Sequence, residues 1–92
     1  MRFEYYYDHE IGMTHVQKHG VSQAEIEEFF EECDYLERRR GDGSTIAIGK
    51  LSSCRYIEVA YRQRRQSYFI ITAYDIEDKE DIQLIDDYLE DL

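Results

Sequence analysis

The chain has 92 residues, a formal net charge of −10, 42% hydrophobic residues and no proline. This length suits one domain, and this apolar content excludes a wholly disordered chain. The two cysteines lack the spacing of a zinc or redox motif. The N-terminus has no apolar run like that of a signal peptide, and no apolar stretch is long enough to span a membrane. We therefore expect a cytoplasmic protein with reduced thiols and no membrane partner.

The acidic charge is concentrated at the C-terminus. Residues 75–92 carry nine acidic side chains and one lysine, net −8, whereas residues 1–74 carry 12 acidic and 10 basic side chains, net −2. The net charge of the whole chain is therefore a poor guide to which charged ligands a surface of residues 1–74 attracts. Within residues 76–92 the apolar positions share one side of a helical wheel, which predicts an acidic amphipathic helix. Its apolar side has to be buried, on an uncovered sheet face or against a second copy of the chain.

The N-terminal segment alternates and is aromatic, which predicts a first strand from Arg2 to Tyr7. Asp8 is expected to cap a helix that runs to His19. On that helix His15 and His19 follow one another at a spacing of four residues.

A sharp corner between two helices is predicted next. Gly20 lacks a Cβ and can take the left-handed conformation that ends a helix. Ser22 then serves as an N-cap, and Glu25 stands three residues on, where a capping box needs its second member. The second helix is expected from Gln23 to about Asp34.

Three strands are expected at hairpin spacing, over residues 45–51, 54–62 and 67–74. Alternation predicts one helix-covered face and one open face. The covered face would hold Ile46, Ile48, Ile57, Val59, Tyr61, Phe69, Ile71 and Ala73. The open face would hold Tyr56, Glu58, Arg62, Tyr68, Ile70, Thr72 and Tyr74. The prediction is an α+β domain over residues 1–92 of order β-α-α-β-β-β-α, with an antiparallel sheet, two helices on one face and the acidic C-terminal helix.

Basic and aromatic residues suggest a nucleic-acid surface. Arg38, Arg39 and Arg40 precede a loop, and Arg62, Arg64 and Arg65 lie at a predicted hairpin tip. Such arginines can follow a phosphate backbone, and the tyrosines of the open face, Tyr56, Tyr68 and Tyr74, can stack on bases. The alternatives are a solvated turn with a solubilising charge run, or a protein-contact surface.

The two histidines of the first helix admit two interpretations. An imidazole pair at this spacing can bind zinc, but no third ligand has supporting spacing, so no metal and no cofactor is predicted. An imidazole can also act in metal-free RNA cleavage, which needs a base, a proton donor and cations around the phosphate. The remaining interpretation is that His19 packs at the helix end and Lys18 is solvated.

Several short motifs resemble one family. Lys-His-Gly-Val-Ser (18–22), Ile-Gly (48–49), Val-Ala-Tyr (59–61) and Ile-Ile-Thr-Ala (70–73) are similar to the BrnT toxins of type II toxin–antitoxin pairs. The resemblance implies a RelE-like fold and ribosome-linked mRNA cleavage, silenced by a DNA-binding antitoxin. Two departures remove positive charge: Tyr74 stands where that family tends to have arginine, and the C-terminal segment is acidic instead of basic.

The resemblance implies an RNA endonuclease in which Lys18 and His19, which match the family motif, are catalytic. We expect the activity to need no metal and to depend also on Arg62, a third catalytic residue that supplies charge at the phosphate. The enzyme's partners would be an antitoxin and RNA or the ribosome. The alternative function is a non-catalytic interaction module of the same fold, whose partner is a protein such as an antitoxin or a second copy of the chain.

Overall fold

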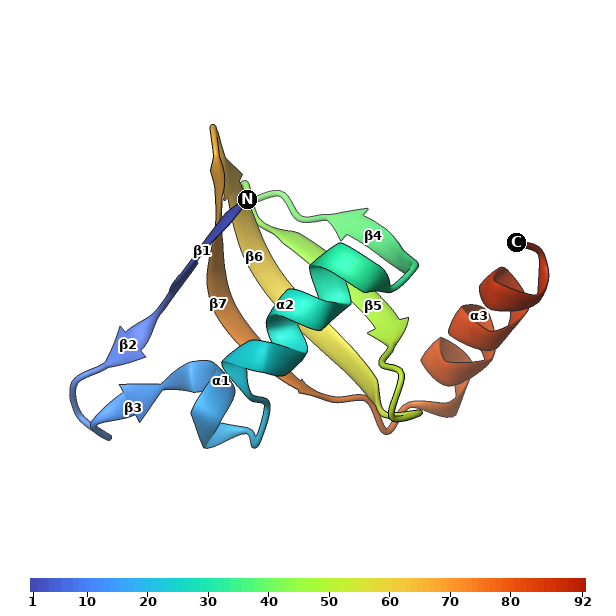
Figure 1. Cartoon of the computed structure of the whole chain (residues 1–92), viewed down its shortest axis with the longest axis horizontal. Coiled ribbons are helices and arrows are strands. Elements are labelled where there is room, and N and C mark those ends of the chain that lie inside the picture. Colours follow the sequence, from blue (N-terminus) through green and yellow to red (C-terminus); the bar gives the residue numbers. More distant parts are fainter.

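The computed structural model describes residues 1–92 as a five-stranded sheet, a small two-stranded sheet and three helices (Figure 1). The strands are β1 (Arg2–Tyr5), β2 (Tyr7–Asp8), β3 (Met13–Thr14), β4 (Tyr35–Arg39), β5 (Thr45–Lys50), β6 (Tyr56–Arg64) and β7 (Ser67–Asp75). The helices are α1 (His15–Lys18), α2 (Gln23–Glu32) and α3 (Lys79–Glu90). The α+β class is thereby confirmed.

The main sheet is mixed and has the strand order β1-β7-β6-β5-β4. Strands β4 to β7 are antiparallel neighbours, but β1 pairs with β7 in parallel. The prediction of a purely antiparallel sheet was therefore wrong at this edge, because the first strand enters beside the last one. The predicted placement of two helices on one face is confirmed, since Val16 of α1 and Phe29 of α2 share one buried cluster with Val59 of β6.

The corner between α1 and α2 forms as its residues predict. Gly20 has a φ of +76°, and Ser22 and Glu25 form a complete capping box, in which each side chain accepts a hydrogen bond from the other's backbone amide. Val21 and Ile26, on either side of the cap, are fully buried. This corner fixes the angle at which α2 crosses the sheet.

Small residues of β5 let α2 approach the sheet closely. Gly49 lies under Phe29, and a Cβ built on Gly49 would lie 2.8 Å from the Phe29 ring. Ala47 faces the same way and is fully buried. The predicted covered face was wrong for Ile46 and Ile48, which point to the opposite face because they alternate with these small residues.

The opposite face is partly covered by α3. Ile85 is 1% exposed, and the Tyr56 hydroxyl donates a hydrogen bond of 2.6 Å to Asp86. Leu84 lines a cavity of about 210 Å³ together with Leu36, Ile46 and Ile48. The predicted acidic helix therefore exists and packs on its own domain, and Figure 1 shows α2 and α3 on different sides of β5.

A β-bulge reverses the alternation within β7. Val59 pairs with Ala73 and Tyr61 pairs with Ile70, so Ile71 is the extra residue. Before the bulge, Ile70 and Tyr68 consequently face α2, whereas Phe69 faces away. The predictions that Phe69 is covered and that Tyr68 and Ile70 are open were wrong for this reason.

The segment expected to be one long helix is a hairpin followed by a single helical turn. Residues 7–14 form β2 and β3 around a turn that contains Gly12 at a φ of +72°. Thr14, not Asp8, caps α1, in a capping box with Gln17. Asp8 stays in β2, because its carboxylate closes the turn by accepting the Glu10 amide.

One strand was not predicted. Residues 35–39 were left between a helix and a loop, but they form the edge strand β4 beside β5. Arg38 and Arg39 are thus sheet residues and Arg40 begins the turn. Charged side chains on an edge strand are a common protection against edge-to-edge aggregation.

Candidate functional site

Seven of the eight arginines lie at one end of the main sheet, which we call the arginine end. Arg39 stands opposite Thr45, while Arg64 stands opposite Ser67, whose other neighbour is Arg2. This is the end at the top of Figure 1, where β4 and β6 finish and where β1, β5 and β7 begin. The members are Arg2, Arg38, Arg39, Arg40, Arg62, Arg64 and Arg65.

Little of this positive charge is neutralised within the chain. Glu4 lies 3.7 Å from Arg2 and 3.8 Å from Arg64. Arg38, Arg39, Arg40 and Arg65 are exposed and form no ion pair within 4.0 Å. The Arg64 guanidinium also lies 4.8 Å from the centre of the Phe69 ring. The surface is positive, with one aromatic face beside it, although the whole chain is acidic.

Arg62 is held against the β4–β5 turn. Its Nη1 donates a hydrogen bond of 2.9 Å to the Asp42 carbonyl oxygen, and Gly43 makes room for the guanidinium because any Cβ there would approach it to 3.0 Å. The hydroxyl and amide of Ser44 donate to the Asp42 carboxylate and, with the nearby Arg40 and Arg62, lower its pKa. Arg62 is therefore a fixed member of the arginine end.

Lys18 and His19 lie far from those arginines. Lys18 ends α1, His19 is its C-cap, and both side chains are exposed. The His19 ring meets the Tyr74 ring edge-on, with centroids 5.8 Å apart. The Tyr74 hydroxyl donates to Glu58, and this hydrogen bond, with burial, raises the pKa of Tyr74 to about 12.

The strand register separates the predicted catalytic residues. Tyr74 stands opposite Glu58, and Arg62 is four residues further along β6, which is about 13 Å at the usual rise of a strand. His19 neighbours Tyr74, and the Arg62 guanidinium is fixed at the β4–β5 turn. Lys18 and His19 thus form one group, and Arg62 belongs to another.

Sequence reasoning missed a second pair close to His19. The Nε2 atom of His15 lies 3.1 Å from Oδ2 of Asp8, and the Tyr6 ring meets the His15 ring edge-on at 4.7 Å. The hydrogen bond to His15 is the main cause that lowers the pKa of Asp8. The sequence feature that could have predicted this pair is the Thr-x-x-Gln capping box at residues 14–17. It starts the helix well after Asp8, so Asp8 lies outside the helix and can contact His15.

The three tyrosines predicted to stack on bases have different surroundings. Tyr56 and Tyr74 lie on the face away from α2, and each hydroxyl donates to a carboxylate. Tyr68 faces α2, where its ring lies 4.7 Å from the Phe30 ring and 5.3 Å from the Tyr61 ring. Tyr68 is therefore part of an aromatic cluster in the core, a consequence of the bulge at Ile71.

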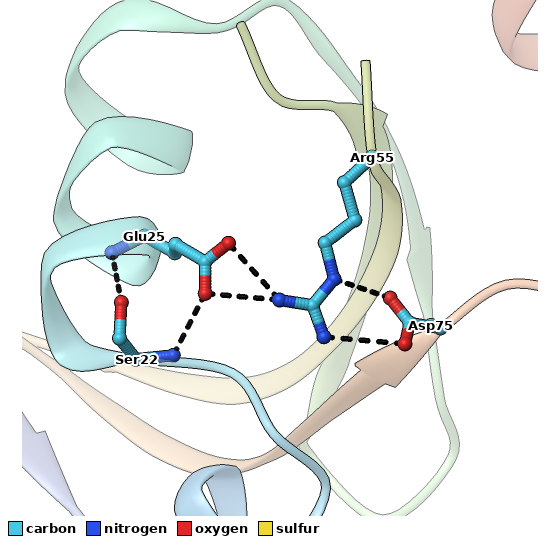
Figure 2. Close-up of polar contacts among 4 residues, drawn as sticks. All are labelled: Ser22, Glu25, Arg55 and Asp75. Atoms are coloured by element: carbon cyan, nitrogen blue, oxygen red, sulfur yellow. Dashed lines mark hydrogen bonds and ion pairs between the residues drawn. The ribbon is translucent and has the colours of Figure 1, made fainter. Parts of the chain in front are cut away.

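Another arginine, Arg55, has a structural environment. Figure 2 shows its guanidinium between Glu25 at the start of α2 and Asp75 at the end of β7. The hydrogen bonds from Arg55 lower the pKa of Asp75. Burial acts to raise the pKa of Glu25, but hydrogen bonds from Ser22 and Arg55 outweigh it and lower that pKa. The Arg55 guanidinium is paired with the carboxylates of Glu25 and Asp75, so it is not available to a ligand.

No group of three or more histidine, cysteine, aspartate or glutamate side chains is arranged to hold a metal ion. His15 and His19 instead contact Asp8 and Tyr74, respectively. Both cysteines are free thiols. None of the helices combines the length and apolar character needed to span a membrane.

Comparison of the chain with protein-family models, curated proteins and solved structures gives no match.

Proposed function

We propose that this protein binds single-stranded RNA through the arginine end and cleaves it as a BrnT-like toxin of a type II toxin–antitoxin pair, without a metal ion. In this proposal a DNA-binding antitoxin is the partner that silences the activity. The observation that carries the proposal is the gathering of seven arginines, from three separate parts of the chain, at one end of the sheet.

The chemistry of the arginine end suits a phosphate backbone. Guanidinium groups bind phosphate oxygens in pairs of hydrogen bonds, and their charge attracts the polyanion from a distance. Five of these side chains form no ion pair within 4.0 Å: Arg38, Arg39, Arg40, Arg62 and Arg65. An acidic chain that gathers seven arginines at one end of its sheet has an uneven charge distribution, which can orient an approaching polyanion.

Within this proposal the arginines bind and Lys18 and His19 act at the cleaved phosphate. His19 is exposed and offers an imidazole within reach of a bound strand, and the Lys18 ammonium can stabilise negative charge on the phosphate. Arg62 contributes to binding, about 13 Å or more from this group by the register of β6. A substrate that reaches both groups has to extend along β7.

RNA binding tests the proposal directly. The variant Arg39→Gln/Arg40→Gln/Arg65→Gln removes three exposed charges that have no ion pair, and Lys79→Gln removes one exposed charge at the start of α3 as a control. Fluorescence anisotropy with a labelled single-stranded RNA should show binding by wild type and Lys79→Gln and at least tenfold weaker binding by the triple variant. Equal affinity of all three proteins would contradict the proposal.

A non-catalytic interaction module is the second candidate, and a different observation favours it. The β2–β3 hairpin and the residue before it expose four large apolar side chains, each 38–46% accessible: Tyr6, Tyr7, Ile11 and Met13. Figure 1 shows this hairpin projecting from the body. Exposed aromatic side chains and methionine are enriched where proteins meet.

Induced expression separates the two candidates. A ribonuclease toxin should stop growth, and His19→Ala should restore it at equal protein level. Growth that continues during wild-type expression, together with intact cellular RNA, would favour the interaction module.

A further inference from the structure

Two imidazoles lie on α1 beside the part of β7 that β1 leaves unpaired. The β1 strand ends at Tyr5, and the Tyr6 amide still donates to the Ile70 carbonyl of β7. The chain then returns, because the His15 amide donates to the Tyr6 carbonyl at 3.2 Å. His15 lies against Tyr6, and His19 lies against Tyr74 near the end of β7. The imidazoles are therefore positioned along one stretch of this strand.

The two histidines are also neighbours on one helical turn. The His19 amide donates to the His15 carbonyl at 3.3 Å, which is the hydrogen bond of an α-helical turn. Side chains at this spacing share a face, with their Cβ atoms about 5–6 Å apart. A phosphodiester between two such rings can be approached from both sides.

Asp8 gives one of these imidazoles a defined orientation. Its charged carboxylate can only accept, so the Nε2 atom of His15, 3.1 Å away, has to be the donor. The His15 and Asp8 side chains are 27% and 21% exposed, so the pair is accessible to a ligand but shielded from bulk water on most sides. The second ring nitrogen, Nδ1, is then the atom that can exchange a proton with a substrate.

We propose that His15 and His19 are an acid–base pair for RNA cleavage, in which His19 is the base, His15 is the acid and Asp8 positions His15. This inference rests on the proposed RNA-cleaving function and adds a catalytic residue to it. Asp8 favours His15 as the acid, because the carboxylate compensates the positive charge of a proton-bearing imidazole. His19 has an aromatic neighbour in place of a carboxylate, so no side-chain partner occupies the ring nitrogen that would accept the proton.

The reaction balances without a metal or a co-reactant. His19 removes the proton of a ribose 2′-hydroxyl, and the 2′-oxygen forms a bond to the adjacent phosphorus. The bond from phosphorus to the 5′-oxygen breaks, and His15 gives its proton to that oxygen. The products are a 2′,3′-cyclic phosphate end and a 5′-hydroxyl end, while the Lys18 ammonium can stabilise the charge on the non-bridging oxygens.

The placement also sets a requirement on substrate length. Residues 67 and 74 mark the ends of β7 near the arginine end and near His19, and seven strand residues span about 23 Å. A stacked strand advances about 3.4 Å per nucleotide, so roughly seven nucleotides connect the two groups. Oligonucleotides of eight or more residues should therefore be cleaved with a much lower KM than dinucleotides.

The experiment compares cleavage of a single-stranded RNA 12-mer by wild type, His15→Ala, His19→Ala and His9→Ala. His9, the third histidine, is exposed in the turn between β2 and β3, and its ring meets the Tyr7 ring edge-on. His9→Ala is therefore the matched control. We expect unchanged cleavage by His9→Ala and a loss of about 10²–10⁴-fold in kcat for each of the other two. Circular dichroism and thermal unfolding establish that every variant is folded, and a His15→Ala/His19→Ala protein purified in parallel measures contaminating nuclease.

A second substrate assigns the two roles. When sulfur replaces the bridging 5′-oxygen, the leaving thiolate needs no proton, so the defect of His15→Ala should shrink to less than about tenfold while that of His19→Ala persists. Asp8→Asn should lower kcat on the oxygen substrate with little change in KM, and it should be rescued by the same sulfur substrate, which a merely structural role would not produce.

The outcomes separate this inference from the function on which it rests. Wild-type cleavage that His15→Ala leaves within threefold overturns the acid–base pair and keeps the ribonuclease. RNA binding without cleavage by the wild type overturns the pair as well but keeps the arginine end. Failure of the wild type to bind RNA overturns the proposed function itself.

Discussion

Arg55 donates hydrogen bonds from Nη1 to both carboxylate oxygens of Glu25, each at 3.0 Å, across a separation of thirty residues. Glu25 also accepts the amide of Ser22, so the same carboxylate closes the capping box of α2 and ties that helix to the β5–β6 connection. Arg55 reaches Asp75 with its other nitrogens. The start of α2, the β5–β6 turn and the end of β7 are thereby held together (Figure 2).

Loss of this guanidinium should destabilise the fold. Arg55 and Glu25 are each only 27% exposed, so Arg55→Gln leaves a half-buried carboxylate without its partner. We expect a decrease of about 1–3 kcal/mol in the free energy of unfolding, measured by urea denaturation. Arg65→Gln, which replaces an exposed arginine without an ion pair, should change stability by less than about 0.5 kcal/mol. A similar effect of both substitutions would argue against a structural role for Arg55.

The same network predicts lower stability in acid. The folded state lowers the pKa of Glu25 and of Asp75 below their ordinary values of 4.5 and 3.8. The unfolded chain therefore binds these protons more readily, and the stabilisation, complete above about pH 5, is lost as the pH falls through the folded values. Urea midpoints between pH 7 and pH 3 should fall for the wild type and fall less for Arg55→Gln. Parallel curves for the two proteins would show that other carboxylates dominate the acid response.

Gly49 should be intolerant of a side chain. A Cβ at this position would lie 2.8 Å from the Phe29 ring, 3.1 Å from the Tyr35 Cβ and 3.3 Å from the Asp34 carbonyl oxygen. Since backbone and core atoms surround it, Gly49→Ala should cost about 1–3 kcal/mol of stability. Gly41→Ala is the control, because nothing lies within 4 Å of its Cβ position. Equal unfolding temperatures of the two variants would mean that α2 can move away from the sheet at little cost.

Cys54 occupies a conformation that favours glycine. Its φ is +73° in the tight turn between β5 and β6, and its side chain is exposed. Cys54→Gly should therefore raise the free energy of unfolding by up to about 1 kcal/mol, because a non-glycine residue is strained there. Ser53→Gly, one residue earlier and without a positive φ, should be neutral or destabilising. A destabilised Cys54→Gly protein would refute this interpretation of the turn.

Local signals predicted the elements that depend on few residues. The corner at Gly20 and Ser22 needs only a glycine and a capping box, and it forms as expected. The three central strands and the amphipathic C-terminal helix were also predicted with small errors at their ends. The helix expected from Asp8 to His19 failed because Gly12 and the Thr14 cap favour a hairpin and then a new start.

The remaining errors come from tertiary structure that the sequence pattern does not contain. Alternation assumes a regular strand, and the single extra residue Ile71 exchanges the faces of Tyr68, Phe69 and Ile70. Alternation alone assigned the isoleucines of β5 to the face under α1 and α2, whereas Ile46 and Ile48 lie on the opposite face beside Leu84 of α3.

The candidate site shows the same division. The individual arginines were predicted as phosphate contacts from composition, but their collection at one sheet end depends on the parallel β1–β7 pairing, which adds Arg2. The contact of Asp8 with His15 depends on the hairpin that replaced the expected helix. Residues that meet only through an unpredicted turn or an unpredicted strand pairing cannot be paired from their spacing alone.

The salt dependence of RNA binding is the sharpest test of whether the arginine end holds the phosphate backbone. For single strands the slope of log K against log salt concentration is about −0.7 for each phosphate contact. We expect a steep slope for the wild type, a slope shallower by about 2 for Arg39→Gln/Arg40→Gln/Arg65→Gln, and an unchanged slope for Lys79→Gln. Equal slopes for the wild type and the triple variant, or no binding by the wild type at low salt, would show that the arginine end does not hold the RNA backbone.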